Sequence, residues 1–296
     1  MHKREDYFID WWSMRDNTDL RLIQGYLTEG FESELFYAAV YNLSDVNNAL
    51  RFSNYAYAFR ELFLHVLKRL APDDRVEECT WFTGRNEQNK VPRKDSYKYI
   101  VQGGLTDEYV IHELGVDNSE VFLGLRDAFA SLNRLTHISE TVFPVNSERG
   151  LEILAQVEGY IAELFRHLDD CHSRIIHLLG QKIGHATIES SVSDTIESID
   201  LLSTHSSLDA VYIEHIKIME INQEEIIFKV SGSVDVGLQW GSNSDIRNDI
   251  GAVGEHSFPF SCEVRSPVDD PENTSCDEEA FIVDTRDWFE NYYDSE

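Results

Sequence analysis

Residues 51–72 read RFSNYAYAFRELFLHVLKRLAP, and this stretch predicts the central helix of a helical core. Its apolar residues recur at spacings of three and four, which places them on one stripe of a helix. They are Phe52, Tyr55, Ala56, Phe59, Phe63, Val66, Leu67 and Leu70. Pro72 follows and cannot continue the helix. A second stripe is polar and consists of Asn54, Glu61, His65 and Lys68.

Helical spacing extends on both sides of this stretch, up to about residue 205. It predicts helices over 31–43, 106–114 and 151–179, and one that begins after Ser119 and ends near 133–138. A further helix is expected to follow over 183–199, with Gly180 and Gly184 marking a place where the chain could bend.

After residue 207 the apolar period changes from 3.6 residues to two, which is typical of strands. Residues 226–240 alternate in this way, and residues 212–221 are expected to pair with them as a hairpin. We expect another strand over 258–264 and an edge strand over 281–284. The predicted class is therefore α+β, with a helical bundle domain over 1–205 and a small antiparallel β domain over 206–296. Much of its acidic tail, from residue 269, is expected to be solvated or loosely attached.

The chain is strongly acidic, with 54 Asp and Glu against 25 Lys and Arg, a net charge of -29. Residues 51–98 differ, because ten basic residues there outnumber seven acidic ones. One interpretation is a soluble protein with one less acidic side. The other is a surface that binds a phosphate backbone while the acidic remainder limits non-specific binding. The residues proposed for that surface are Arg69, Arg85, Lys90, Arg93, Lys94 and Lys98.

No apolar run approaches the ~18 residues that a membrane span needs, and the first residues do not resemble a signal peptide. The four cysteines lie far apart without a CxxC pair, which is typical of cytoplasmic thiols. We therefore expect a cytoplasmic protein without a metal site or cofactor. The loop over 241–255 is interpreted as a hairpin connection, since its acidic spacing differs from that of an EF-hand.

Arg60 and His65 are separated by four residues, the spacing of the HEPN ribonuclease motif. Metal-independent RNA cleavage needs a His to move a proton and a guanidinium to stabilise the charged phosphorane. Residues five apart in a straight helix lie about 140° apart around its axis, so a kink or a second element is required. Glu61 and His65 share a face, and this carboxylate could orient the imidazole. The alternative is a solvated polar face.

His137 lies at a predicted helix end, in the sequence NRLTHI. A His at a helix C-terminus is often only a partner of the helix dipole. The alternative is a second catalytic or phosphate-contacting His that the bundle brings beside Arg60 and His65.

Several stretches together resemble a bacterial family, the predicted PIWI-associating nucleases, between about residues 54 and 284. They are SNYAYAFRELFLHVLKRLAPDD (53–74), CTWF (79–82), YIVQGGLTDEYV (99–110), LTHI (135–138), SDTIESIDLLSTH (193–205), GLQWGSNSDIRND (237–249) and SFPFSCEVRSPVDDP (257–271). The resemblance implies a setting in bacterial defence. Its motifs place candidate site residues at Arg60, Glu61, His65 and His137.

The preferred function is a nuclease, a metal-independent RNase in an anti-phage or mobile-element defence system. His65 or His137 would act as general acid and base, Arg60 would stabilise the phosphate, and Glu61 would orient the imidazole. The expected partners are nucleic acid, RNA rather than DNA, a PIWI-like defence protein and a second copy of the chain. The alternative function is a non-catalytic acidic adaptor or regulatory subunit that binds a basic partner protein.

Overall fold

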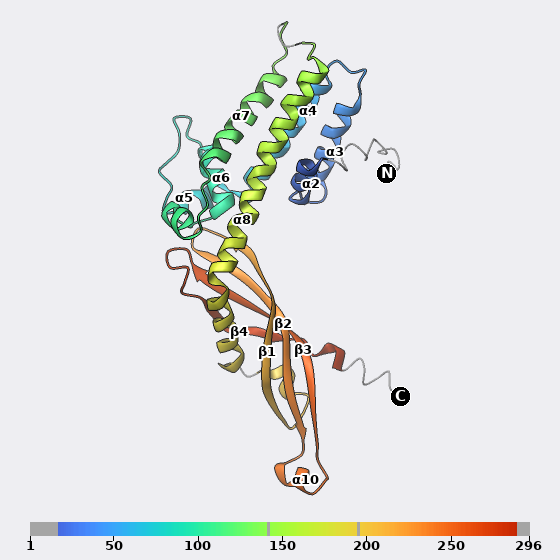
Figure 1. The fold of residues 1–296 in the computed structure, drawn as a ribbon, viewed down its shortest axis with the longest axis vertical. Helices are drawn as coiled ribbons and strands as arrows, with labels where there is room; N and C mark the ends of the chain where they lie inside the picture. Colours follow the sequence, from blue (N-terminus) through green and yellow to red (C-terminus); the bar gives the residue numbers. More distant parts are fainter. Residues whose placement is uncertain (1–16, 141–142, 194–195, 289–296) are drawn as a thin grey trace. The chain divides into compact units, whose positions relative to one another are not determined.

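A computed structural model describes residues 17–140, 143–193 and 196–288, and it has helices followed by an antiparallel sheet (Figure 1). The predicted α+β class is confirmed. The chain divides into two compact units, residues 1–171 and 172–296. The helices before the sheet are α2 (Thr18–Gly25), α3 (Phe31–Ser44), α4 (Arg51–Leu70), α5 (Asp73–Glu78), α6 (Arg93–Gln102), the π-helix η1 (Tyr109–Glu113), α7 (Ser119–Thr136), α8 (Ser147–Ser193) and α9 (Glu197–Asp200).

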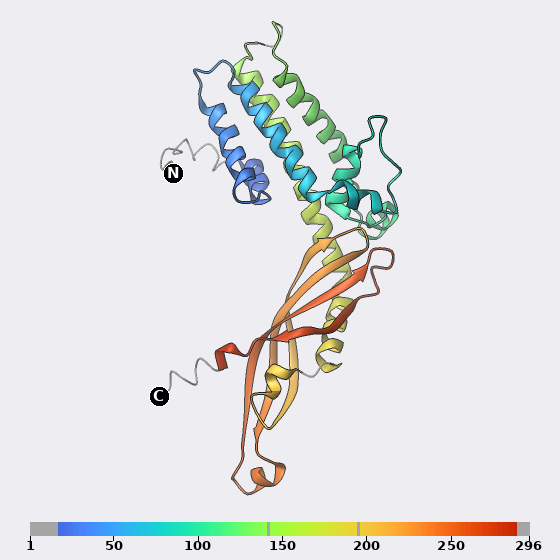
Figure 2. The ribbon, with the colours of Figure 1, turned by 180° about the vertical axis from the view of Figure 1, so that it is seen from behind.

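Helix α4 is the centre of the first unit, as its apolar stripe predicted. Phe52, Tyr55, Phe59 and Leu62 are almost fully buried. Figures 1 and 2 show α4 between α3 and α7, and it contacts both helices. Burying side chains of this size supplies about 2 kcal/mol each, so the stripe determines how the bundle packs.

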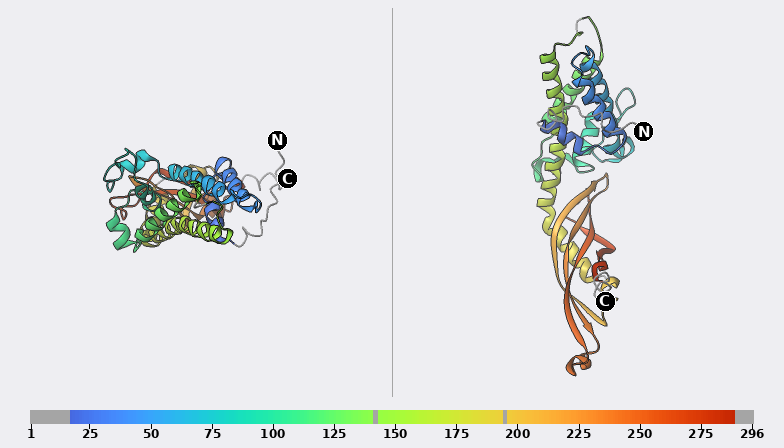
Figure 3. Two further views of the ribbon diagram at one scale, coloured as in Figure 1. Left: turned by 90° about the horizontal axis from the view of Figure 1, so that it is seen from above. Right: turned by 90° about the vertical axis from the view of Figure 1, so that its right-hand side faces the viewer.

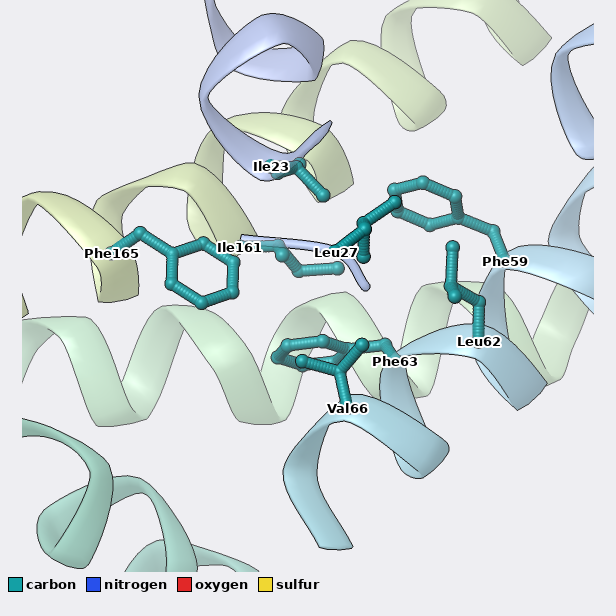
Figure 4. A pocket seen from close by; sticks show the side chains of 8 residues that line it. All are labelled: Ile23, Leu27, Phe59, Leu62, Phe63, Val66, Ile161 and Phe165. Carbon is teal, nitrogen blue, oxygen red and sulfur yellow. The ribbon is translucent and has the colours of Figure 1, made fainter. Parts of the chain in front are cut away.

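The apolar core of this unit also includes the first half of α8. A gap of about 10 Å³ lies where α2, α4 and α8 meet (Figure 4). Only apolar side chains line it, and a volume of this size holds one water at most. They are Ile23, Leu27, Phe59, Leu62, Phe63, Val66, Ile161 and Phe165. The gap is therefore a packing feature of the core and not a binding site.

One carboxylate is built into this core. Glu158 on α8 accepts a hydrogen bond from the Tyr55 hydroxyl (2.6 Å) and one from Asn17 Nδ2 (2.9 Å). Burial raises the pKa of Glu158, although both hydrogen bonds act to lower it. The Asn17 side chain also caps α2, because its Oδ1 accepts from the backbone of Asp19 and Leu20. Glu158 thus links the start of α2 to α4.

The further helix expected over 183–199 is largely the continuation of α8. Helix α8 continues through Gly180 and Gly184 to Ser193, and only the short α9 follows. A glycine inside a helix costs only about 1 kcal/mol, and the buried residues Leu179 and Ile183 outweigh that cost. The expected helix over 106–114 forms as the single π-helical turn η1, and Gly115 follows it with a left-handed φ of 66°.

The second unit is a four-stranded antiparallel sheet in the order β1-β2-β3-β4. The predicted hairpin is formed by the first two strands, with Ile221 opposite Ile226. The last turns of α8 lie along one face of the sheet (Figure 3), where the Cys276 thiol contacts the Ala186 carbonyl. The strands are β1 (His205–Ile221), β2 (Glu225–Trp240), β3 (Ala252–Pro267) and β4 (Ser275–Val283), and α10 (Asn243–Arg247) connects β2 to β3.

The acidic C-terminal segment is more ordered than its charge predicted. Strand β4 begins at Ser275, six residues before the expected edge strand, and it pairs with β3. Phe281 and Val283 are buried, so apolar contacts hold an otherwise acidic strand. Residues 289–296 lie outside the described part of the chain. Among the helices of the described ranges, none is long and apolar enough to cross a membrane.

Candidate nucleic-acid site

The Arg60 side chain extends from α4 to the last turns of α7. Its Nη1 donates to Asn133 Oδ1 (3.2 Å) and to Thr136 Oγ1 (3.4 Å), both in the last turns of α7. Its Nε and Nη2 donate to Glu61 Oε1 at 3.1 and 2.7 Å. The guanidinium also lies 5.5 Å from the ring centre of Tyr57. With 22% of its side chain exposed, Arg60 is held in place but still reaches the surface.

His137 ends α7 immediately after these contacts. It is the C-terminal cap of the helix, its backbone N–H donates to the Asn133 carbonyl (3.2 Å), and its side chain is exposed. The hydroxyl of Thr136 donates to the same carbonyl (2.8 Å). Arg60 therefore contacts the residue next to His137, and the fold brings these two predicted site residues to one end of α7.

His65 lies on the other side of α4. Its Nε2 is 3.5 Å from Glu32 Oε1 on α3, and its ring packs edge-on against Phe31 with 4.9 Å between ring centres. Glu61, which we expected beside His65, accepts from Arg60 instead. The pairing of Glu61 with His65 is thus wrong, and Arg60 and His65 contact different helices. The reason is the angle of about 140° between residues five apart.

Two family models match the chain, one over residues 24–164 and the other over residues 168–289. Both are described as predicted pPIWI-associating nuclease. The chain belongs to this family. The resemblance noted from sequence is confirmed, and membership supports a nuclease role. Among curated proteins and among solved structures, the chain has no significant match.

The buried carboxylate of Glu32 contacts two side chains of α4, His65 and Arg69. It is 1% exposed and accepts from Arg69 Nε at 2.7 Å and from the backbone of Thr28 at 2.8 Å. Burial raises the pKa of Glu32, but the hydrogen bonds from Arg69 and Thr28 outweigh burial, and the net pKa is lowered. Arg69 also donates to the Tyr26 carbonyl (2.8 Å). Two of its three guanidinium nitrogens, Nε and Nη2, therefore have partners within the fold.

Two other cations of the predicted phosphate-binding surface have partners within the chain. Lys98 forms an ion pair with Asp107 (2.7 Å), lies 4.3 Å from the centre of the Trp81 ring and is only 12% exposed. Arg85 forms an ion pair with Glu77 and donates to the Asn89 carbonyl (2.9 Å). These contacts compete with any nucleic acid for Lys98 and Arg85.

The remaining three cations, Lys90, Arg93 and Lys94, are exposed. They lie at the start of α6 and in the loop that precedes it. The Arg93 guanidinium lies over the Phe129 ring of α7, 4.3 Å from its centre, which positions the side chain without neutralising it. This short basic segment is the part of the predicted surface that is most accessible to a phosphate backbone.

Asn133 and Thr136 were not predicted as site residues. The sequence could have indicated them, because Asn133 and Thr136 are three residues apart in NRLTHI and therefore share a face at the helix end. No group of three His, Cys, Asp or Glu side chains that could hold a metal ion occurs in the described ranges.

Proposed function

We propose that this protein is a nuclease that cleaves RNA at the surface between α4 and α7. Arg60 binds and stabilises the phosphate, and His137 transfers the proton as general acid or base. The observation that carries the proposal is that Arg60 hydrogen-bonds the last turns of α7, beside exposed His137.

The contacts of Arg60 suit this role. Glu61 and Asn133 fix the guanidinium from two sides, so little conformational entropy is lost when a phosphate binds. In this proposal Glu61 positions Arg60 and not an imidazole. His137 is exposed and hence accessible to a ribose hydroxyl or a leaving oxygen.

Lys90, Arg93 and Lys94 hold the RNA backbone in this proposal, because all three are exposed cations of the basic stretch. His65 enters the chemistry only through a second copy of the chain, whose α4 supplies it to the Arg60 of the first. The family description names an association with PIWI proteins, and we propose a PIWI-like partner and a role in defence against phages or mobile elements.

The test is cleavage of labelled single-stranded RNA and DNA, with and without EDTA, by the purified full chain. We expect RNA cleavage that survives EDTA and falls at least ~100-fold in Arg60→Ala and in His137→Ala. Arg126→Ala and His112→Ala are matched controls, since Arg126 pairs with its neighbour Asp127 as Arg60 pairs with Glu61. Both controls should cleave at the parental rate.

His65→Ala separates the one-chain site from the two-chain site. If one chain suffices, His65→Ala retains activity. If two are needed, His65→Ala and Arg60→Ala are each inactive, and mixing them restores part of the activity. Cleavage that is unchanged in both Arg60→Ala and His137→Ala would contradict the proposed site.

A second candidate function, the acidic adaptor, is favoured by one observation in the sheet unit. An open groove of about 510 Å³ crosses β1, β2 and β3, and it includes Asp209 and Glu255. A basic segment of a partner protein would complement this charge. Pulldown of a PIWI-like partner by the parental protein but not by Asp209→Asn plus Glu255→Gln, without nuclease activity in either, would support the adaptor.

A further inference from the structure

Cys262 on β3 and Cys276 on β4 have their sulfur atoms 3.5 Å apart. This separation is longer than the ~2.05 Å of a disulfide bond, so the two are thiols in van der Waals contact. Cys262 is buried, at 2% exposure, whereas Cys276 is partly exposed. The Cys276 sulfur also lies 3.5 Å from the Ala186 carbonyl of α8. Cys276 therefore contacts both Cys262 and the last part of α8.

An irregularity in β4 brings the two cysteines together. Cys262 lies opposite Phe281, whereas Val264, two residues further along β3, lies opposite Cys276. Residues 277–280 of β4 therefore oppose a single residue of β3. This bulge shortens the distance along the sheet between the two pairings and places Cys276 next to Cys262 on the same face.

We propose that Cys262 and Cys276 form a reversible disulfide when the protein meets a low-molecular-weight disulfide such as glutathione disulfide. The Cys276 thiolate attacks one glutathione sulfur, and one glutathione thiolate leaves. The Cys262 thiolate then attacks the Cys276 sulfur, forms the Sγ–Sγ bond and releases the second glutathione thiolate. The two cysteines lose two electrons and two protons, and one glutathione disulfide becomes two glutathione molecules.

The order of attack follows from exposure. Cys276 is accessible to a small oxidant, and buried Cys262 is already in contact with it and resolves the mixed disulfide. Cys79 and Cys171 are internal controls because both are buried in the helical unit. Burial raises the pKa of the Cys79 thiol to about 12, so little of it is thiolate for a first attack on glutathione disulfide.

The cross-link would change the behaviour of β4. Among the described strands, β4 forms one edge of the sheet and pairs only with β3. A disulfide closes the segment between residues 262 and 276 and lowers the entropy of the unfolded chain. We expect slower amide hydrogen exchange over 275–283 and a rise of roughly 5 °C in the melting temperature of the sheet unit, both reversed by dithiothreitol.

The experiment treats the full chain with glutathione disulfide, alkylates the denatured protein with a maleimide and maps its peptides by mass spectrometry. Of the four cysteines, two should be protected, and one peptide should contain Cys262 joined to Cys276. Cys262→Ala should stop at one glutathione on Cys276 and show no rise in melting temperature. Four alkylated cysteines after oxidation, or bonds that join two chains or involve Cys79 or Cys171, would overturn the proposal.

Discussion

Arg69 Nε donates a 2.7 Å hydrogen bond to the carboxylate of Glu32, and this ion pair joins α4 to α3 with the carboxylate almost fully buried. An arginine from the most basic part of the chain thus stabilises the fold. Removing it would leave a buried charge without its main partner, which is far more costly than losing an exposed ion pair.

Arg69→Met should therefore lower the free energy of unfolding by roughly 2–4 kcal/mol, measured by urea denaturation. Arg126→Met, which removes an exposed arginine from α7, should change it by less than about 0.5 kcal/mol. The folded fraction of Arg69→Met should bind RNA as the parental protein does. A loss of RNA affinity without a loss of stability would instead assign Arg69 to the nucleic-acid surface.

The same pair predicts a pH dependence. The pKa of Glu32 in the folded protein lies below its ordinary value of 4.5. Its ionised form is thus favoured by folding, and its contribution is present above the unfolded pKa and lost as the pH falls through the folded one. Glu32→Gln should be markedly less stable than the parental protein at pH 7, and the difference should shrink below pH 4.5. Urea unfolding at pH 7, 5, 4 and 3 measures this, and a constant difference would refute it.

Asn133 and Thr136 should act as positioning residues for Arg60. Asn133→Ala combined with Thr136→Val removes both α7 acceptors of Arg60 Nη1, and we expect a drop of roughly 10-fold in kcat with little change in stability. Ser131→Ala on the same helix is the control, because Ser131 accepts from Arg134 and not from Arg60. Parental kcat in the double variant would show that Arg60 needs no support from α7.

Replacing Lys90, Arg93 and Lys94 by Ala should weaken RNA binding, because each of these side chains is expected to neutralise one phosphate. Without the three cations, the slope of log K against log salt should become shallower by about 2, measured by fluorescence anisotropy. Ala at Lys217, Lys229 and Arg247 removes three exposed cations from the sheet unit and should leave the slope unchanged. If both triple variants keep the slope of the parental protein, the RNA binds elsewhere on the surface.

Two glycines should respond to alanine with opposite signs. A Cβ at Gly232 would lie 1.9 Å from the Tyr212 carbonyl oxygen, a backbone atom of the paired strand β1. Gly232→Ala should thus lower the free energy of unfolding by roughly 3 kcal/mol or more. Gly180→Ala has open space in helix α8 and should raise it by about 0.5–1 kcal/mol. Thermal unfolding distinguishes the two, and stabilisation by Gly232→Ala would contradict the close approach.

The fold could be predicted from sequence where the local spacing of apolar residues identifies the buried face of a helix or strand. The apolar spacing of α4 and the alternation of β2 each identify the buried face directly, which is why the α+β class was correct. The length of α8 was not predictable, since a glycine signals a helix end only when tertiary packing does not override it. The same holds for β4, where buried Phe281 and Val283 outweigh the acidic residues around them.

The candidate site was less predictable because its contacts join distant parts of the chain. Helical spacing correctly separates Arg60 from His65, but it cannot reveal that Glu32 of α3 lies beside His65. Nor can it reveal that Arg69 is held by the same carboxylate while Arg93 remains exposed. Partner choice for charged side chains depends on packing between helices, which local patterns do not encode.

The acidic residues of β4 have a consequence for how copies of this protein behave at high concentration. An edge strand with unpaired backbone groups is a template on which another sheet can add. Asp277 and Glu279 are exposed on this strand, and two copies that approached through its edge would bring these like charges together. The acidic residues that led us to expect a solvated segment are thus charges that oppose edge-to-edge pairing of two sheets.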